Sequence, residues 1–236
     1  MTDLAALLQL ADAAFPAGGF GHSFGLETAI VEGRVHDGPT LRAWIESYLL
    51  ESCATLDGAA MALLLGDAVS IERLDERLCA AVPNAEIRRA NAHLARATLD
   101  TYLALGLAEE SPSANPLGAA GRRIGAYRAA IAGGRCGGVH ALAAACGYAA
   151  IGAPIETMLE AYATTIVAAF ASVAARAVPL GQRDVARARW ALRPAIACFV
   201  TLGAAARAID DLRASAVACE IDGLAHRRLP ARLFAS

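Results

Sequence analysis

Apolar residues recur along this chain at spacings of three and four, the period of a helix that buries one face. Leu41, Trp44, Ile45 and Tyr48 form one such stripe. Glycine and proline interrupt the pattern and mark where helices end. The predicted helices cover residues 2–13, 23–32, 40–49, 56–65, 71–82, 84–107, 119–132, 139–150, 155–178 and 183–212, with a bend or break at Pro194 in the last and a loop at 109–118.

No segment alternates between apolar and polar residues as a half-buried strand would. Composition agrees, because 56% of residues are hydrophobic while only 6% are aromatic, and the apolar mass is largely alanine, leucine and valine. Alanine favours helices, whereas strands favour β-branched and aromatic side chains. We therefore predict an all-α fold, with residues 1–236 forming a single-domain compact helical bundle of about nine or ten helices.

Charge and hydropathy argue against a nucleic-acid-binding protein and against a membrane protein. All 21 basic residues are arginine, and 23 acidic residues give a net charge of −2, which argues against a nucleic-acid partner. Mean hydropathy is +0.42, yet the apolar run at 161–175 stops at Arg176 before reaching the ~20 residues of a membrane span. We predict no membrane association. The first residues, MTDLAALLQLAD, lack the basic start of a signal peptide, so we predict a cytoplasmic protein.

Metal and redox motifs are not visible in the sequence. The six cysteines include no C-x-x-C pair, and the five histidines include no pair four residues apart. Buried, reduced cysteines are the better interpretation. We predict no metal site and no cofactor, while a site assembled by the fold stays open.

The segment FPAGGFGHSFGLE contains GHSFG, residues 21–25, which matches the G-x-S-x-G elbow of serine hydrolases. That elbow needs a preceding strand, and none is predicted here. A serine hydrolase is therefore the less favoured alternative, and we expect no catalytic residues. The favoured interpretation is a structural turn in which Ser23 caps the next helix; its residues are Pro16, Gly18, Gly21, Ser23, Gly25 and Glu27.

Two later stretches indicate a helix end and a docked C-terminal segment. In RAVPLGQ, residues 176–182, Arg176 suits the negative end of a helix before proline and glycine turn the chain. The stretch HRRLPARLFAS, residues 226–236, carries apolar side chains where a frayed terminus would expose them to water. We predict a docking tail at about 220–236 that binds its own domain or a partner.

Together these stretches resemble the UreF family of urease accessory proteins. LLQLADAAFPAGGFGHSFGLETAI, residues 7–30, is similar to the opening block of that family, RAVPLGQ to a second block, and RLFAS to its terminus, with His226 at the matching distance upstream. Two departures are Ala235, where the family usually has arginine, and NAHLA at 91–95, where Ser-x-x-Met-Gly is more typical.

The resemblance implies a non-catalytic, all-α cytoplasmic protein that dimerises. It implies that the chain bridges the accessory protein UreD, also called UreH, to the GTPase UreG, and regulates that GTPase while nickel is delivered to apo-urease. On this basis UreD would cover a surface that includes the tail, and UreG would meet a surface near the second block. The residues expected to bind partners are Arg176, Gln182, His226, Arg232, Leu233 and Phe234.

Overall fold

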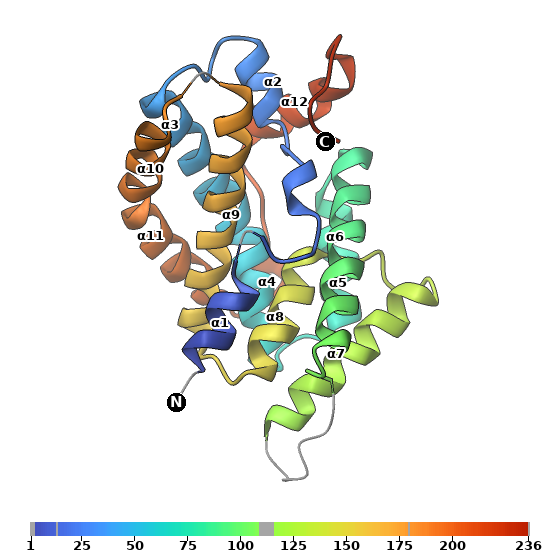
Figure 1. Cartoon of the computed structure of the whole chain (residues 1–236). Coiled ribbons are helices and arrows are strands. Elements are labelled where there is room, and N and C mark those ends of the chain that lie inside the picture. The colour runs from blue at the N-terminus through green and yellow to red at the C-terminus, as the bar shows by residue number, and fades with distance from the viewer. Residues whose placement is uncertain (1–2, 13, 109–115, 179, 236) are drawn as a thin grey trace.

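The computed structural model describes residues 3–12, 14–108, 116–178 and 180–235, and in these ranges the chain is helical with no strand (Figure 1). The all-α prediction is thus confirmed. The α-helices are α1 Leu4–Leu10, α2 Leu26–Val31, α3 Gly38–Tyr48, α4 Ala59–Leu65, α5 Ile71–Ala81, α6 Ala85–Ala104, α7 Pro116–Ala132, α8 His140–Ala150, α9 Ile155–Ala177, α10 Gln182–Ala191, α11 Arg193–Ala204 and α12 Val217–Ala225. Short 3₁₀ helices cover Gly19–Gly21, Ile209–Asp211 and His226–Arg228.

Helices α3 and α4 are the ends of one continuous helix, where the sequence pattern predicted two. A π-helix, Leu49–Gly58, joins them. Asp37 and Thr40 form a capping box at the start, so α3 begins at Gly38, before the predicted Thr40. The π-helix has a wider turn that shifts the apolar stripe to a new face. The gap between the two predicted helices is therefore a place where the apolar stripe changes face, and the helix itself continues.

The core is built around α8, which is buried without interruption from Ala141 to Tyr148. Small side chains allow its neighbours to approach closely: a Cβ atom added to Gly147 would lie 2.3 Å from the ring of Tyr102 on α6. Gly58 of the π-helix lies close to Gly203 of α11, and a Cβ atom added to Gly203 would be 3.1 Å from the carbonyl carbon of Gly58. Alanine and glycine at these positions let backbones pack where larger residues would hold them apart.

Several predicted boundaries differ from the structure for identifiable reasons. Asp3, and not Thr2, caps α1, because its carboxylate accepts the N–H of Ala6 at 3.1 Å. The predicted loop at 109–118 is only partly covered, since 109–115 lie outside the described residues and α7 already begins at Pro116. The break near Pro194 is confirmed between α10 and α11, but the helix ends at Ala204 and not at Leu212. Helix α12 was not predicted.

Two continuous helices, Gly38–Leu65 and Ile155–Ala177, are long and apolar enough to cross a membrane by length and composition. In each, 56% of the most apolar window is buried inside the protein. Core helices of soluble proteins pass the same test, so these two helices give only weak evidence for a span.

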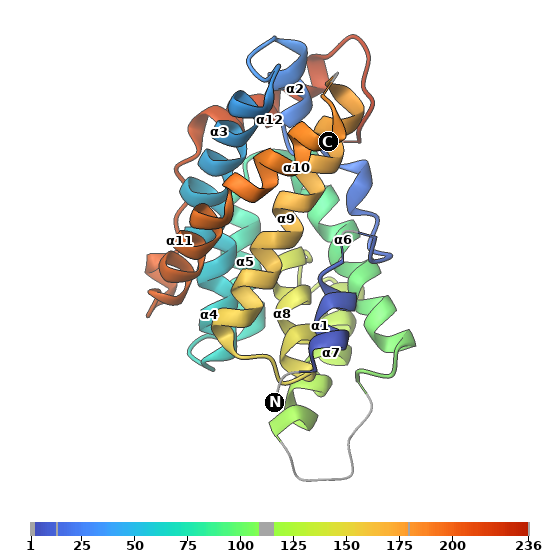
Figure 2. The same ribbon diagram turned by 60° about the vertical axis from the view of Figure 1, so that its left-hand side comes forward.

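The two views place the chain's segments at opposite ends of an elongated bundle (Figures 1 and 2). Helices α1 and α7 lie toward one end, and α2 and α12 lie together at the other, beside the start of α6. The C-terminal segment returns to this second end. The early turn and the late tail, far apart in sequence, thus form one neighbourhood.

Candidate interaction site at the turn and the tail

The turn between α1 and α2 relies on glycine at two positions. Gly18 and Gly25 have φ angles of +81° and +98°, in the left-handed region that glycine adopts most readily. Gly25 also lies against the backbone of α12, and an added Cβ atom would be 2.6 Å from the amide nitrogen of Gly223. The Gly21 carbonyl accepts the N–H of Ala235 at 2.7 Å. The turn is therefore shaped to receive the C-terminal segment.

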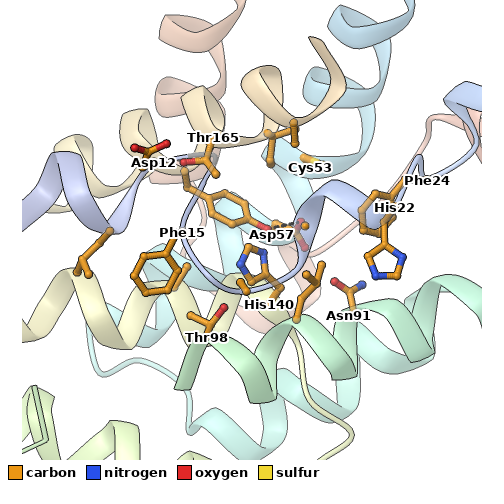
Figure 3. A pocket seen from close by; sticks show the side chains of 18 of the residues that line it. Asp12, Phe15, His22, Phe24, Cys53, Asp57, Asn91, Thr98, His140 and Thr165 are labelled. Atoms are coloured by element: carbon orange, nitrogen blue, oxygen red, sulfur yellow. Dashed lines mark hydrogen bonds between the residues drawn. The ribbon is translucent and has the colours of Figure 1, made fainter. Parts of the chain in front are cut away.

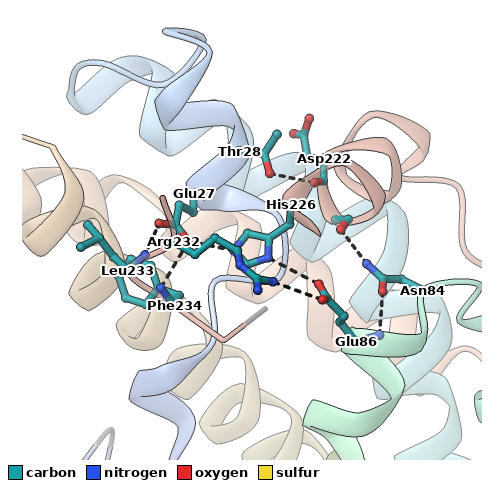
Figure 4. Close-up of polar contacts among 10 residues, drawn as sticks. Glu27, Thr28, Asn84, Glu86, Asp222, His226, Arg232, Leu233 and Phe234 are labelled. Atoms are coloured by element: carbon teal, nitrogen blue, oxygen red, sulfur yellow. Dashed lines mark hydrogen bonds and ion pairs between the residues drawn. The ribbon is translucent and has the colours of Figure 1, made fainter. Parts of the chain in front are cut away.

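Glu27, at the start of α2, is the centre of this contact (Figure 4). Its side chain is buried, and its Oε1 accepts the N–H of Leu233 at 2.6 Å. Its Oε2 accepts the N–H of Phe234 at 3.3 Å and lies 2.8 Å from Nε2 of His226. A buried carboxylate is stable only when it is well paired. Here the tail supplies all three of these partners.

A second carboxylate approaches His226 from the opposite side of its ring. Nδ1 of His226 lies 3.6 Å from Oε2 of Glu86 on α6, and neither buried atom has a hydrogen-bond partner among the residues that the structure describes. Arg232 of the tail reaches the other oxygen of Glu86 at 3.3 Å. The tail thus binds both α2 and α6 through charged groups (Figure 4).

Helix α12 is fixed separately through Asp222. Its carboxylate accepts hydrogen bonds from the guanidinium of Arg34 and, at 3.0 Å, from the indole N–H of Trp44. The hydrogen bond to the Asp222 carboxylate raises the pKa of Arg34 well above its usual value, so the guanidinium stays charged. The Asp222 carbonyl accepts from Thr28, and the Gly223 carbonyl from Asn84.

The residues predicted to bind partners have different environments. The guanidinium of Arg176 lies 4.6 Å above the ring of Phe234, and Phe234 is buried against its own chain. Leu233, in contrast, is 73% exposed. Gln182 begins α10 and is exposed, and within the described ranges it makes no hydrogen bond with the tail. The structure therefore brings together Arg176, His226, Arg232 and Phe234, and leaves Gln182 apart.

The prediction that Ser23 caps α2 is wrong. The helix begins at Leu26 with Gly25 as its N-cap, and Ser23 contributes its carbonyl, which accepts the N–H of Leu26 at 3.0 Å. The Ser23 side chain is fully buried, and a 3₁₀ helix precedes it where a hydrolase elbow needs a strand. The G-x-S-x-G match therefore lacks the exposed nucleophile that defines the elbow.

Sequence reasoning missed Glu86, Asp222 and Arg34. Arg232 lies 146 residues from Glu86, and Asp222 lies 188 residues from Arg34, so local patterns could not pair them. One signal was available. Asp222 stands between apolar residues in VACEIDGLA, as an acidic residue does when the fold supplies a partner. The cysteine prediction was also incomplete, since Cys198 is exposed and Cys79 is partly exposed, although all six are free.

Comparisons with known proteins agree with the resemblance in the sequence. The UreF family matches residues 35–193. The chain is 33% identical over 232 residues to a urease accessory protein UreF from Arthrobacter sp. (strain FB24), covering 98% of this chain and 96% of the relative. UreF proteins from Paenarthrobacter aurescens (strain TC1) and Corynebacterium glutamicum (strain R) are each 32% identical, over 98% of this chain and 97% and 96% of their own lengths.

Proposed function

Because this chain belongs to the UreF family of urease accessory proteins, we propose that it is a non-catalytic protein that bridges UreD (UreH) and the GTPase UreG during urease maturation. The family assignment supports a role in maturation. The resemblance and the surface described next support the proposed bridging role.

The observation that carries the proposal is an apolar face on α12. Val217, Ile221 and Leu224 recur at spacings of four and three, so they share one side of the helix. They are 62%, 59% and 42% exposed, and we call them the α12 face. Apolar residues on one helix face are normally covered, either by the same chain or by a partner. We propose that UreD covers the α12 face together with the exposed Leu233.

The remaining partners are assigned to other parts of the chain. We propose that UreG meets a surface near Arg176 and Gln182, and that GTPase regulation acts there. A second copy of this chain would complete a homodimer, and the assembly would deliver nickel, as cargo, to apo-urease in the cytoplasm. His226, Arg232 and Phe234 would contribute indirectly, because they hold the tail in place.

Copurification with UreD tests the proposal. Ile221→Asp places a charge in the middle of the α12 face, and we expect it to reduce UreD binding and urease activation strongly. Leu8→Asp is the matched control, because Leu8 is 63% exposed on α1 at the other end of the bundle. Circular dichroism would verify that both variants fold. Unchanged UreD binding by folded Ile221→Asp protein would contradict the proposal.

A further inference from the structure

A cavity of about 120 Å³ lies beneath the turn between α1 and α2 (Figure 3). This volume equals roughly four water molecules. The π-helix, α6, α8 and α9 form its walls, and the N-terminal segment covers it. Aromatic rings make up much of the lining: Phe15, Phe24, Tyr48, Tyr102, Tyr148, Tyr162 and Phe170.

The charges in this cavity are all negative. Asp57 lies on the π-helix inside the cavity, and Asp12 lies at an exposed position of the lining. Among the described residues, no arginine lines the cavity, although the chain has 21 basic residues. The lining histidines add no positive charge near neutral pH, since burial lowers the pKa of His140 to about 4 and also lowers that of His22.

Asp57 has no cationic partner within the described part of the chain. Its Oδ2 accepts a hydrogen bond from the hydroxyl of Tyr162 at 3.2 Å. Burial raises its pKa to about 6, so above that pH it carries a charge with few compensating groups. Thr98 adds a buried hydroxyl to the same cavity, and this hydroxyl has no hydrogen-bond partner in the described ranges. The Cys53 thiol also hydrogen-bonds the Asp57 carboxylate. Within the described part of the chain, Asp57 therefore lacks a cation, and Thr98 lacks a hydrogen-bond partner.

We propose that this cavity binds a small alkylammonium cation. The ammonium group would pair with the Asp57 carboxylate, and its N–H groups could be shared with the Thr98 hydroxyl. Aromatic rings attract cations through their faces and accommodate the alkyl part. A divalent metal fits less well, because no group of three His, Cys, Asp or Glu side chains in the described ranges could hold one.

The cavity lies within this chain alone, so this site does not depend on binding to UreD or UreG. Methylammonium chloride is the probe, titrated into the full-length protein in sodium buffer and followed by calorimetry and by thermal shift. Sodium chloride at equal ionic strength is the reference. We expect saturable binding and a rise in melting temperature with methylammonium only.

Asp57→Asn should weaken methylammonium binding by about tenfold or more. The matched control, Asp210→Asn, changes an exposed aspartate outside the cavity and should bind as the wild type does. If Asp57→Asn does not fold, the wild-type pH profile decides, since binding should fall as the pH drops below about 6. The absence of saturable binding, binding that ignores both Asp57→Asn and pH, or Asp57-dependent binding of Ni²⁺ without binding of methylammonium would each overturn the proposal.

Discussion

A single carboxylate, that of Glu27, carries much of the contact between the turn and the tail. It accepts two backbone N–H groups and pairs with His226, all in a buried position. Charge-assisted hydrogen bonds are stronger than neutral ones, and a buried group that loses its partner is costly. Glu27 therefore determines where the tail lies.

Glu27→Ala should lower the free energy of unfolding by about 3–5 kcal/mol, because it leaves His226 and two backbone N–H groups without their acceptor. Glu32→Ala is the matched control. Glu32 is exposed and pairs with Arg34 at the surface, so its loss should cost at most ~1 kcal/mol. Urea denaturation measures both values. Equal effects would show that the Glu27 contacts contribute little.

Asp57 should make stability depend on pH in a defined direction. Burial raises its pKa from 3.8 to about 6, so the folded state binds more protons than the unfolded state between these values. Stability due to this group then falls as the pH rises through that window. Asp57→Asn removes the effect, so its melting temperature relative to wild type should increase between about pH 4 and pH 7 in sodium buffer. A constant difference across this range would contradict the assignment.

At the scale of elements, periodicity and capping were enough to predict an all-helical chain. Long helices such as α6 and α9 have clear apolar stripes and clear stops. The π-helix was not predictable, since its register is decided by packing against α11. Helix α12 was missed because it is short, and Asp222 finds its partners only after folding. The turn at 15–27 was recognisable because its residues are adjacent in the sequence. The Glu27 contacts were not, because their partners come together only after folding.

Gly25→Ala should be more damaging than Gly33→Ala, although both glycines have positive φ angles of +98° and +75°. Left-handed backbone alone costs a non-glycine residue roughly 1–2 kcal/mol, and no neighbouring atom of the described chain lies within 4 Å of a Cβ atom added to Gly33. At Gly25 the added carbon would clash with Gly223, which costs about 1–3 kcal/mol more. Thermal melts of both variants provide the comparison. Similar losses would mean that α12 moves aside freely.

At the scale of the whole molecule, the tail is part of the folded domain. Phe234 is buried, Arg176 covers its ring, and Arg232 binds α6. The sequence left open whether the tail binds its own domain or a partner. The structure places Phe234 on its own domain and leaves Leu233 exposed for other contacts.

Deleting residues 226–236 should therefore lower the melting temperature before any partner is added. Burial of the Phe234 side chain alone contributes about 1.5–3 kcal/mol, and the deletion also leaves Glu27 buried without His226. Far-UV circular dichroism should still show a helical protein, because α8 packs chiefly on α4, α6 and α7, which the deletion leaves in place. A truncated protein with the wild-type melting temperature would contradict this prediction.

The contact between Glu27 and Phe234 spans 207 residues, and this separation has a kinetic consequence. Closing so long a loop is entropically unfavourable until the intervening helices have assembled. The tail should therefore dock after the transition state for folding. Substitutions at Phe234 should then speed unfolding while leaving the folding rate almost unchanged. The neighbourhood that joins the two distant parts of the chain would be the last to form and the first to open.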